Sequence, residues 1–188
     1  MTQTDVSMNL YLSYIGGEND ALGKLISIHG ASLVLFINRY VNNIATSEEL
    51  MVDTFCDLVL KKPRFKGNST FKTYLFKIAK NKAISYVRHV SRYGTVPLAD
   101  VENELRDTVT LEEMVIENEE KRAVLHAMNK LSADHATVLQ LIYFEELSHA
   151  DTAFIMRRTV GQIKALVYRA RQALKNELEK GGYVYEEG

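Results

Sequence analysis

Proline occurs at only two positions in this chain of 188 residues, Pro63 and Pro97. Because proline removes a backbone donor and clashes with the preceding helical turn, its rarity leaves long stretches free to form α-helices. Four pairs of residues also have the spacing of a capping box at a helix start: Thr46 with Glu49, Thr110 with Glu113, Ser148 with Asp151, and Thr159 with Gln162. The sequence therefore predicts an all-α protein.

Apolar residues recur every three or four positions along three N-terminal segments, as on the buried face of a helix. We expect helices over residues 20–41, 47–61 and 69–89. In the first, the inward positions are Leu22, Leu25, Ile26, Leu33, Phe36, Ile37 and Tyr40. In the second they are Met51, Phe55, Leu58 and Val59. In the third they are Tyr74, Leu75, Ile78, Ala79, Ile84 and Val87.

The charge of this chain is segregated, although its formal net charge is only -1. Residues 61–92 hold ten lysines and arginines and no aspartate or glutamate. Aromatic residues run through the same stretch and directly follow it: Phe65, Phe71, Tyr74, Phe76 and Tyr86 lie within it, and Tyr93 comes next. Basic groups neutralise phosphates and ring faces stack on unpaired bases, so this segment indicates a nucleic-acid partner, most simply an opened strand.

An acidic segment separates this basic block from a second one. Residues 100–120 carry nine acidic side chains against the single Arg106, and residues 152–176 carry six basic side chains and no carboxylate. Such asymmetry indicates separate modules with a bridging segment. We expect a helical domain over residues 1–92, a linker over 93–110, a second domain over 111–180 and a tail over 181–188.

The C-terminal part has the length pattern of a helix-turn-helix. We expect a helix over residues 148–156, a turn at Arg157 and Arg158, and a last helix over 159–180. Apolar residues fall on one side of the last helix: Val160, Ile163, Val167, Ala170, Leu174 and Leu178. Polar and basic groups remain outside on its first turns, which suits a helix that enters the major groove of DNA.

No enzyme, metal site or cofactor is expected. The five histidines are scattered singly, and Cys56, the only cysteine, is expected to be a small core residue of the second helix. The N-terminal residues do not resemble a secretion signal, and the apolar run from Ala31 to Ile37 is too short to cross a bilayer. The protein is most simply cytoplasmic, without membrane insertion.

Three segments occur in an order typical of one known family. They read SEELMVDTF over residues 47–55, FKTYLFKIAKN over residues 71–81 with Arg88 beyond it, and LSHADTAFIMRRTVGQIKALVYRAR over residues 147–171. In this order they resemble the extracytoplasmic-function group of the sigma-70 family of RNA polymerase sigma factors. The resemblance covers residues 20–178.

The resemblance implies a fold, an activity and partners. The fold would be a region 2 helical bundle and a region 4 helix-turn-helix joined by a flexible acidic linker. The activity would be that of an alternative sigma factor, which directs core RNA polymerase to promoters and helps to open them. The implied partners are core polymerase, through its clamp helices and flap, promoter DNA, and an anti-sigma factor.

The resemblance also assigns roles to residues. The core polymerase contact falls on Glu49, Leu50, Asp53 and Asp57, three of which form an acidic stripe along one helix face. The contacts to the minus-ten element fall on Lys66, Asn68, Phe71, Lys72, Lys77, Lys80, Asn81 and Arg88. The contacts to the minus-thirty-five element fall on Thr159, Gln162, Lys164, Ala165, Tyr168, Arg169 and Arg171.

Five positions depart from the family pattern. Val52 stands where glutamine is usual, Tyr74 where tryptophan is usual, Ser85 where aspartate is often found, and Leu166 where arginine is frequent. Arg157 replaces the glycine of the turn, so it must either accept a left-handed backbone or force a different turn.

Other interpretations stay open at this stage. The acidic stripe is also compatible with a solvated helix face, and the linker with a simple tether. A conventional helix-turn-helix regulator that dimerises on a palindrome, or an adaptor that binds polymerase without opening DNA, are the competing functions.

Overall fold

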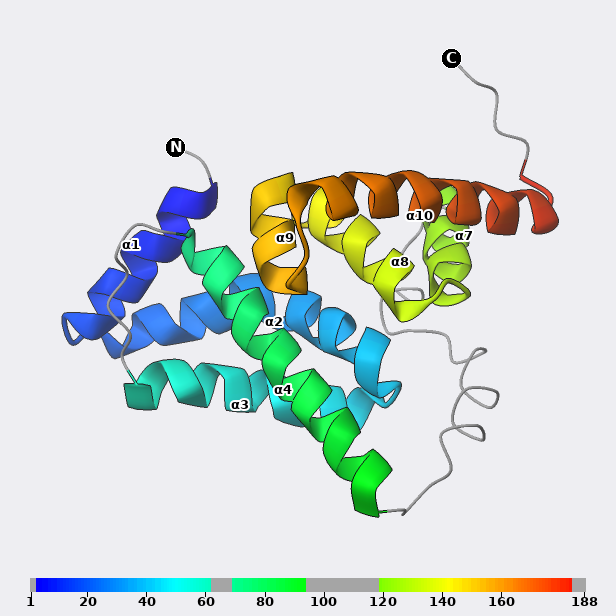
Figure 1. The fold of residues 1–188 in the computed structure, drawn as a ribbon. Coiled ribbons are helices and arrows are strands. Elements are labelled where there is room, and N and C mark those ends of the chain that lie inside the picture. Colours follow the sequence, from blue (N-terminus) through cyan, green and yellow to red (C-terminus); the bar gives the residue numbers. More distant parts are fainter. Residues whose placement is uncertain (1–2, 62–68, 94–118, 184–188) are drawn as a thin grey trace. The chain divides into compact units, whose positions relative to one another are not determined.

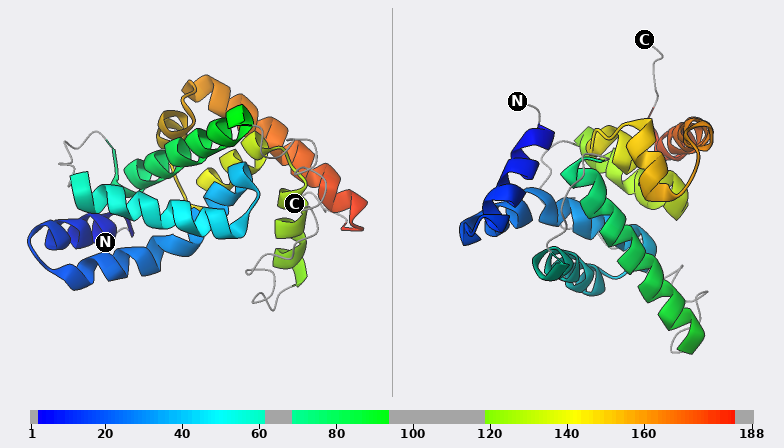
Figure 2. Two further views of the ribbon diagram at one scale, coloured as in Figure 1. Left: turned by 90° about the horizontal axis from the view of Figure 1, so that it is seen from below. Right: turned by 60° about the vertical axis from the view of Figure 1, so that its left-hand side comes forward.

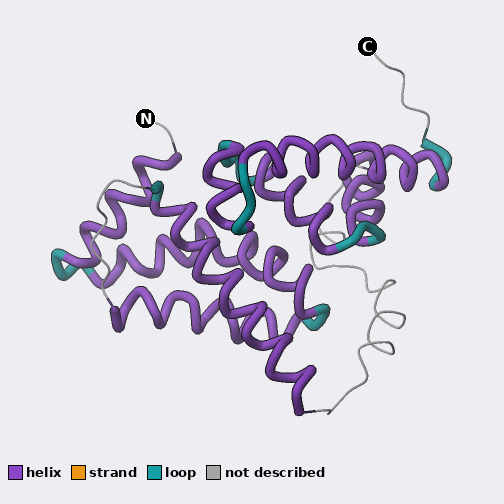
Figure 3. The backbone as a smooth tube through the Cα atoms, viewed as in Figure 1, coloured by secondary structure: helices purple, strands orange, loops and turns teal. Residues whose placement is uncertain are grey.

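The computed structural model describes residues 3–61, 69–93 and 119–183. These residues form helices joined by short turns, with no strand among them (Figures 1 and 3). The all-α prediction is confirmed. The helices group into two compact units, the first built from α1 to α4 and the second from α7 to α10 without Phe154–Arg157. The exact domain boundaries expected from the sequence remain a prediction.

The first unit is organised around α2 (Asn19–Val41), which contacts α1 (Gln3–Ile15), α3 (Ile44–Lys61) and α4 (Phe71–Tyr93). Figures 1 and 2 show the four helices lying together in each view. Phe36 of α2 and Phe76 of α4 are fully buried, and their rings meet edge to face with centroids 5.0 Å apart. Because buried aromatic pairs contribute both area and specific geometry, this contact fixes α4 on α2.

Helix boundaries follow the predictions closely, with one wrong cap. The helix expected from residue 47 begins at Ile44, because the side-chain oxygen of Asn43 accepts a hydrogen bond from the Thr46 backbone at 2.9 Å. Thr46 therefore lies inside the helix and does not cap it. The predicted cap at Thr110 lies outside the described residues. Helix α1 was not predicted, and α4 extends to Tyr93, beyond the expected end at residue 89.

Helix α2 corrects one further expectation. By length and composition it could cross a membrane, contrary to the view that no apolar stretch approaches that length. The central helix of a folded unit passes the same test, and α2 buries Leu25, Leu33, Phe36 and Ile37 completely. Its apolar length is accounted for by its contacts with three neighbouring helices.

The second unit contains α7 (Glu119–Asn129), α8 (Ala133–Leu139), a π-helical turn η1 (Gln140–Phe144), the part of α9 (His149–Met156) that precedes Phe154, and α10 (Val160–Lys180). Helix α10 packs on α7 and α8. Both predicted caps in this unit are confirmed, because Ser148 Oγ accepts from the Asp151 backbone at 3.0 Å and Thr159 forms a full capping box with Gln162. The helix-turn-helix is therefore formed by α9 and α10, as the sequence predicted.

The turn between α9 and α10 shows which backbone conformation Arg157 adopts in place of the glycine. Its φ angle is 54°, so the arginine accepts the left-handed backbone that glycine adopts more easily. Leu166, the other departure in this motif, is only 4% exposed and contributes to the core of the second unit. Both departures are thus compatible with the family fold.

Replacing Arg157 by glycine should stabilise the helix-turn-helix. A left-handed non-glycine residue costs about 1–2 kcal/mol, part of which is offset by the greater freedom of glycine in the unfolded chain. We expect Arg157→Gly to raise the free energy of unfolding by about 1 kcal/mol in urea denaturation. Arg158→Gly is the control, because it removes a contact with Asp134 and relieves no left-handed angle. A loss of stability in Arg157→Gly would show that the arginine side chain outweighs the backbone strain.

Candidate nucleic-acid interface

The outer face of α10 carries all seven residues predicted for the second DNA contact. Each of them is exposed: Thr159, Gln162, Lys164, Ala165, Tyr168, Arg169 and Arg171. On the opposite face Ile163, Leu166, Val167 and Ala170 are buried. The helix therefore buries an apolar stripe and presents a basic, polar surface over its first three turns. Tyr168, the aromatic residue of this surface, is 68% exposed.

The capping box limits what Gln162 can do. Its side-chain oxygen accepts a hydrogen bond from the Thr159 backbone at 2.9 Å, while Thr159 Oγ1 accepts from the Gln162 backbone at 3.2 Å. A glutamine that reads adenine uses both its oxygen and its nitrogen. While the cap is intact, one of the two acceptor positions of this oxygen is occupied, which restricts the directions from which Gln162 can contact a base.

The residues of α4 that were predicted to contact DNA differ in their exposure to solvent. Asn81 and Arg88 are exposed, and Lys72 and Lys77 are half-buried. Lys66 and Asn68 lie outside the described residues. Lys77, Asn81 and Arg88 fall on one side of α4 at helical spacing, whereas Lys72 lies on another side.

Two members of the minus-ten set are corrected by the structure. Phe71 is fully buried, with its ring 5.2 Å from the ring of Tyr11 and 6.1 Å from that of His29. Lys80 is only 7% exposed, on the side of α4 that also buries Phe76 and Ala83. A residue packed in the core cannot stack on a base or reach a phosphate without unfolding its surroundings.

Helix α1 explains why Phe71 is buried. Tyr11, itself 1% exposed, covers the first residue of α4, and desolvation of its hydroxyl raises the pKa of Tyr11 to about 12. One turn earlier, Ser7 Oγ lies 2.8 Å from His29 Nε2 in the interior. Sequence reasoning missed α1, although Ser7 and Tyr11 have the i, i+4 spacing of a buried helix face.

Helix α3 presents two of its acidic residues freely. Glu49 and Asp53 are exposed and form no ion pair with any described residue, and Leu50 beside them is half-buried. Val52 is 54% exposed and Leu60 80% exposed on the same helix. Cys56 is exposed as well, so its predicted place in the core is wrong.

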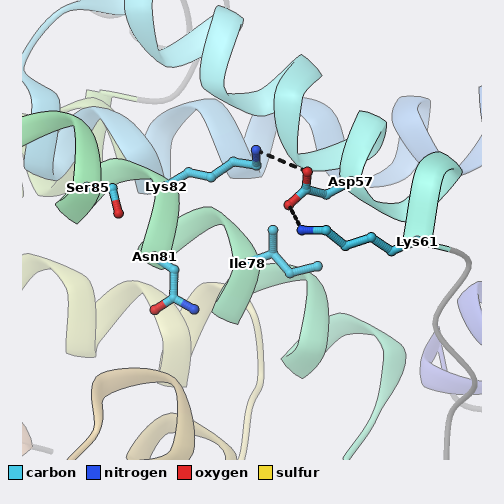
Figure 4. A pocket seen from close by; sticks show the side chains of 6 residues that line it. All are labelled: Asp57, Lys61, Ile78, Asn81, Lys82 and Ser85. Atoms are coloured by element: carbon cyan, nitrogen blue, oxygen red, sulfur yellow. Dashed lines mark hydrogen bonds and ion pairs between the residues drawn. The ribbon is translucent and has the colours of Figure 1, made fainter.

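Asp57 behaves differently from the rest of the acidic stripe. Its Oδ2 lies 2.8 Å from Lys61 Nζ and its Oδ1 lies 3.4 Å from Lys82 Nζ, so it joins α3 to α4 (Figure 4). The hydrogen bond from Lys61, and to a lesser degree the charge of Lys82, holds the pKa of Asp57 below its ordinary value despite partial burial. Asp57, Lys61 and Lys82 line a pocket of about 290 Å³ with Ile78, Asn81 and Ser85.

The described residues contain no group of three or more His, Cys, Asp and Glu side chains that could hold a metal ion. His29 is the only described histidine in the buried class, and its hydrogen bond to Ser7 ties α2 to α1.

The chain matches two regions of one protein family. Sigma-70 region 2 matches residues 25–93, and Sigma-70 region 4 matches residues 121–174. The ECF RNA polymerase sigma-E factor of Haemophilus influenzae is 29% identical over 173 residues, which is 87% of this chain and 90% of that protein. The ECF RNA polymerase sigma factor SigW of Bacillus subtilis is 26% identical, over 86% of this chain and 91% of that protein. The chain belongs to the extracytoplasmic-function group of sigma-70 family sigma factors.

A solved structure supports the same assignment of this sigma factor. The sigma factor RpoE of Bartonella quintana, crystallised in complex with the anti-sigma factor NepR, has a TM-score of 0.67 and 25% identity. The match covers 84% of this chain and 96% of that one. The resemblance inferred from the sequence is confirmed. This sigma factor is therefore a DNA-binding transcription initiation factor that directs core RNA polymerase to promoters.

Proposed function

We propose that three surfaces of this sigma factor have separate binding roles in promoter recognition. The exposed acids of α3 bind core polymerase, the basic face of α4 binds and helps to open the minus-ten element, and the outer face of α10 reads the minus-thirty-five element. The observation that carries the proposal is that all seven predicted residues of α10 and its N-cap are exposed above a buried apolar stripe. A helix so arranged can enter the major groove without disturbing its own core.

The polymerase contact is assigned to Glu49 and Asp53, with Leu50 at its edge. Both acids are exposed and form no ion pair with a described residue, so they are available to a basic helix pair such as the clamp. Charges of this kind steer association and fix register between partners. The flap contact is assigned to the second unit as a whole, without specific residues.

The minus-ten contact is assigned to Lys72, Lys77, Asn81 and Arg88 of α4. Their partly exposed cations can neutralise phosphates, and the exposed amide of Asn81 can meet a base edge. Phe71 and Lys80 are left out because they are buried.

Lys164 provides a test of the minus-thirty-five surface. Lys164→Ala should weaken promoter binding by the holoenzyme by about 1–3 kcal/mol if the lysine reads a base, and should relax preference at one base pair. Lys180→Ala is the control, because Lys180 is an exposed lysine of the same helix that pairs with Glu177 in its last turn. Binding is measured by fluorescence anisotropy on duplexes with every base substitution in the upstream motif. Equal binding by Lys164→Ala and wild type would remove Lys164 from the surface.

An anti-sigma partner, a cytoplasmic location and the absence of enzymatic activity complete the proposal. The solved relative was crystallised with an anti-sigma factor, which supports a partner of that class for this chain. The polymerase carries out the chemistry, and this chain acts by binding.

The decisive experiment is transcription in vitro with core polymerase, this protein and genomic fragments, followed by sequencing of the start sites. Discrete starts that share two upstream motifs are the expected result. Polymerase binding without any start would favour the adaptor, and dimeric binding to a palindrome without polymerase would favour the regulator.

A further inference from the structure

We propose that Lys61 and Lys82 form a phosphate-binding pair on the promoter side of α4, and that Asp57 is its internal competitor, which limits the affinity of the protein for DNA. The inference rests on the proposed binding of promoter DNA by α4. It assigns Asp57 to DNA binding, whereas the sequence placed this residue in the polymerase contact.

The pair is defined by its geometry. The two ammonium groups converge on one carboxylate from different helices, Lys61 from α3 and Lys82 from α4, and each takes a separate oxygen of Asp57 (Figure 4). Two positive charges and one negative charge leave a local excess of one positive charge. Such an excess favours a further anion at the same place.

The pocket also contains uncharged hydrogen-bond donors. Its walls include the amide of Asn81 and the hydroxyl of Ser85, both exposed donors, and its volume of about 290 Å³ has room for a phosphodiester group. Asn81 also belongs to the predicted minus-ten set. A backbone phosphate of the promoter strand is therefore the ligand that this pocket suits, with Lys61, Lys82 and Ser85 as its donors.

Asp57 competes with that phosphate for the same lysines. The pair with Lys61 is open to solvent on the lysine side, and exposed ion pairs contribute little to stability, so a phosphate can displace the carboxylate from Lys61. The side chain of Lys61 is 67% exposed and can swing away from Asp57, whereas that of Lys82 is 22% exposed and stays in the pocket. Because its pKa is held low, Asp57 remains charged and keeps competing throughout the neutral pH range.

Asp53 supplies a matched control. It lies one turn earlier on α3, is exposed and forms no ion pair with a described residue. Asp53→Asn and Asp57→Asn therefore remove the same charge from the same helix with the same change of shape. If Asp57 contacted the polymerase as the sequence predicted, the two variants would behave alike.

The experiment measures holoenzyme binding to a mapped promoter duplex and to a nonspecific duplex of equal length, over a series of salt concentrations. Neutralising one phosphate changes the slope of log affinity against log salt by about 0.9. Asp57→Asn should bind both duplexes several-fold more tightly and steepen this slope by about 1 to 2, with unchanged affinity for core polymerase. Asp53→Asn should leave the slope unchanged and weaken core binding. Adding Lys82→Gln to Asp57→Asn should reverse about half of the change in slope.

The outcomes separate this inference from the proposed function. A wild-type holoenzyme that binds no promoter overturns both. Normal wild-type binding with an unchanged slope in Asp57→Asn overturns the inference alone, and weakened core binding by Asp57→Asn returns that residue to the polymerase contact.

Discussion

Phe71→Ala is expected to lower the free energy of unfolding of the first unit by about 3–5 kcal/mol, the cost of deleting a buried phenylalanine ring. Phe71 is fully buried as the first residue of α4, beneath Tyr11 and near His29. Truncation leaves a cavity where α1, α2 and α4 meet. The measurement is urea denaturation followed by circular dichroism, with the transition of the second unit as an internal reference.

Two controls make this result specific. Phe71→Leu keeps most of the buried volume and should recover much of the lost stability. Phe144→Ala truncates a phenylalanine that is 52% exposed and should change the free energy of unfolding far less. If Phe71→Ala leaves stability unchanged but loses binding to single-stranded DNA, Phe71 is the stacking residue that the sequence suggested and the described packing does not persist on DNA.

The double variant Glu49→Lys and Asp53→Lys is expected to weaken binding to core polymerase by at least about 100-fold. The change replaces two exposed acids by cations opposite a basic partner, and like charges brought together cost several kcal/mol. Neither acid forms an ion pair with a described residue, so the fold should be retained. The affinity is measured by competition for core polymerase against a labelled sigma factor.

Asp20→Lys, in the first turn of α2, is the control for the change of charge, because Asp20 is exposed on another helix. Core binding should be unchanged in this variant. Wild-type affinity in the α3 double variant would support the interpretation of the acidic stripe as a solvated face, and the polymerase contact would then have to lie elsewhere.

Local sequence signals predicted the helices well where a single residue decides a helix end. Thr159 and Ser148 cap α10 and α9 as their spacing indicated, because such a cap depends only on the next three residues. The cap predicted at Thr46 is wrong because Asn43 lies three residues earlier, and its side-chain oxygen accepts a hydrogen bond from the Thr46 backbone. The departure at Arg157 was recognised in the sequence, but only the backbone showed that the arginine takes the left-handed angle.

The functional residues also differ in whether a local sequence pattern could predict their exposure. The exposed face of α10 could be predicted because the apolar stripe of one helix defines its opposite side. Phe71 and Lys80 were misassigned because their burial depends on the packing of α4 within the first unit, with the unpredicted helix α1 covering Phe71. Cys56 was misassigned for the complementary reason, since no described residue covers it and it is exposed.

By itself the sequence determined the all-α fold, the helix-turn-helix and the family, since these follow from periodicity, caps and the order of local patterns along the chain. Only the tertiary structure decided which charges are available to partners. Lys61 of the same helix already distinguishes Asp57 from Glu49 and Asp53, but only the packing of α4 on α3 brings Lys82 to the second oxygen of Asp57. Ion pairing across helices is set by distances between segments far apart in the chain, and the periodicity of one helix contains no information on them.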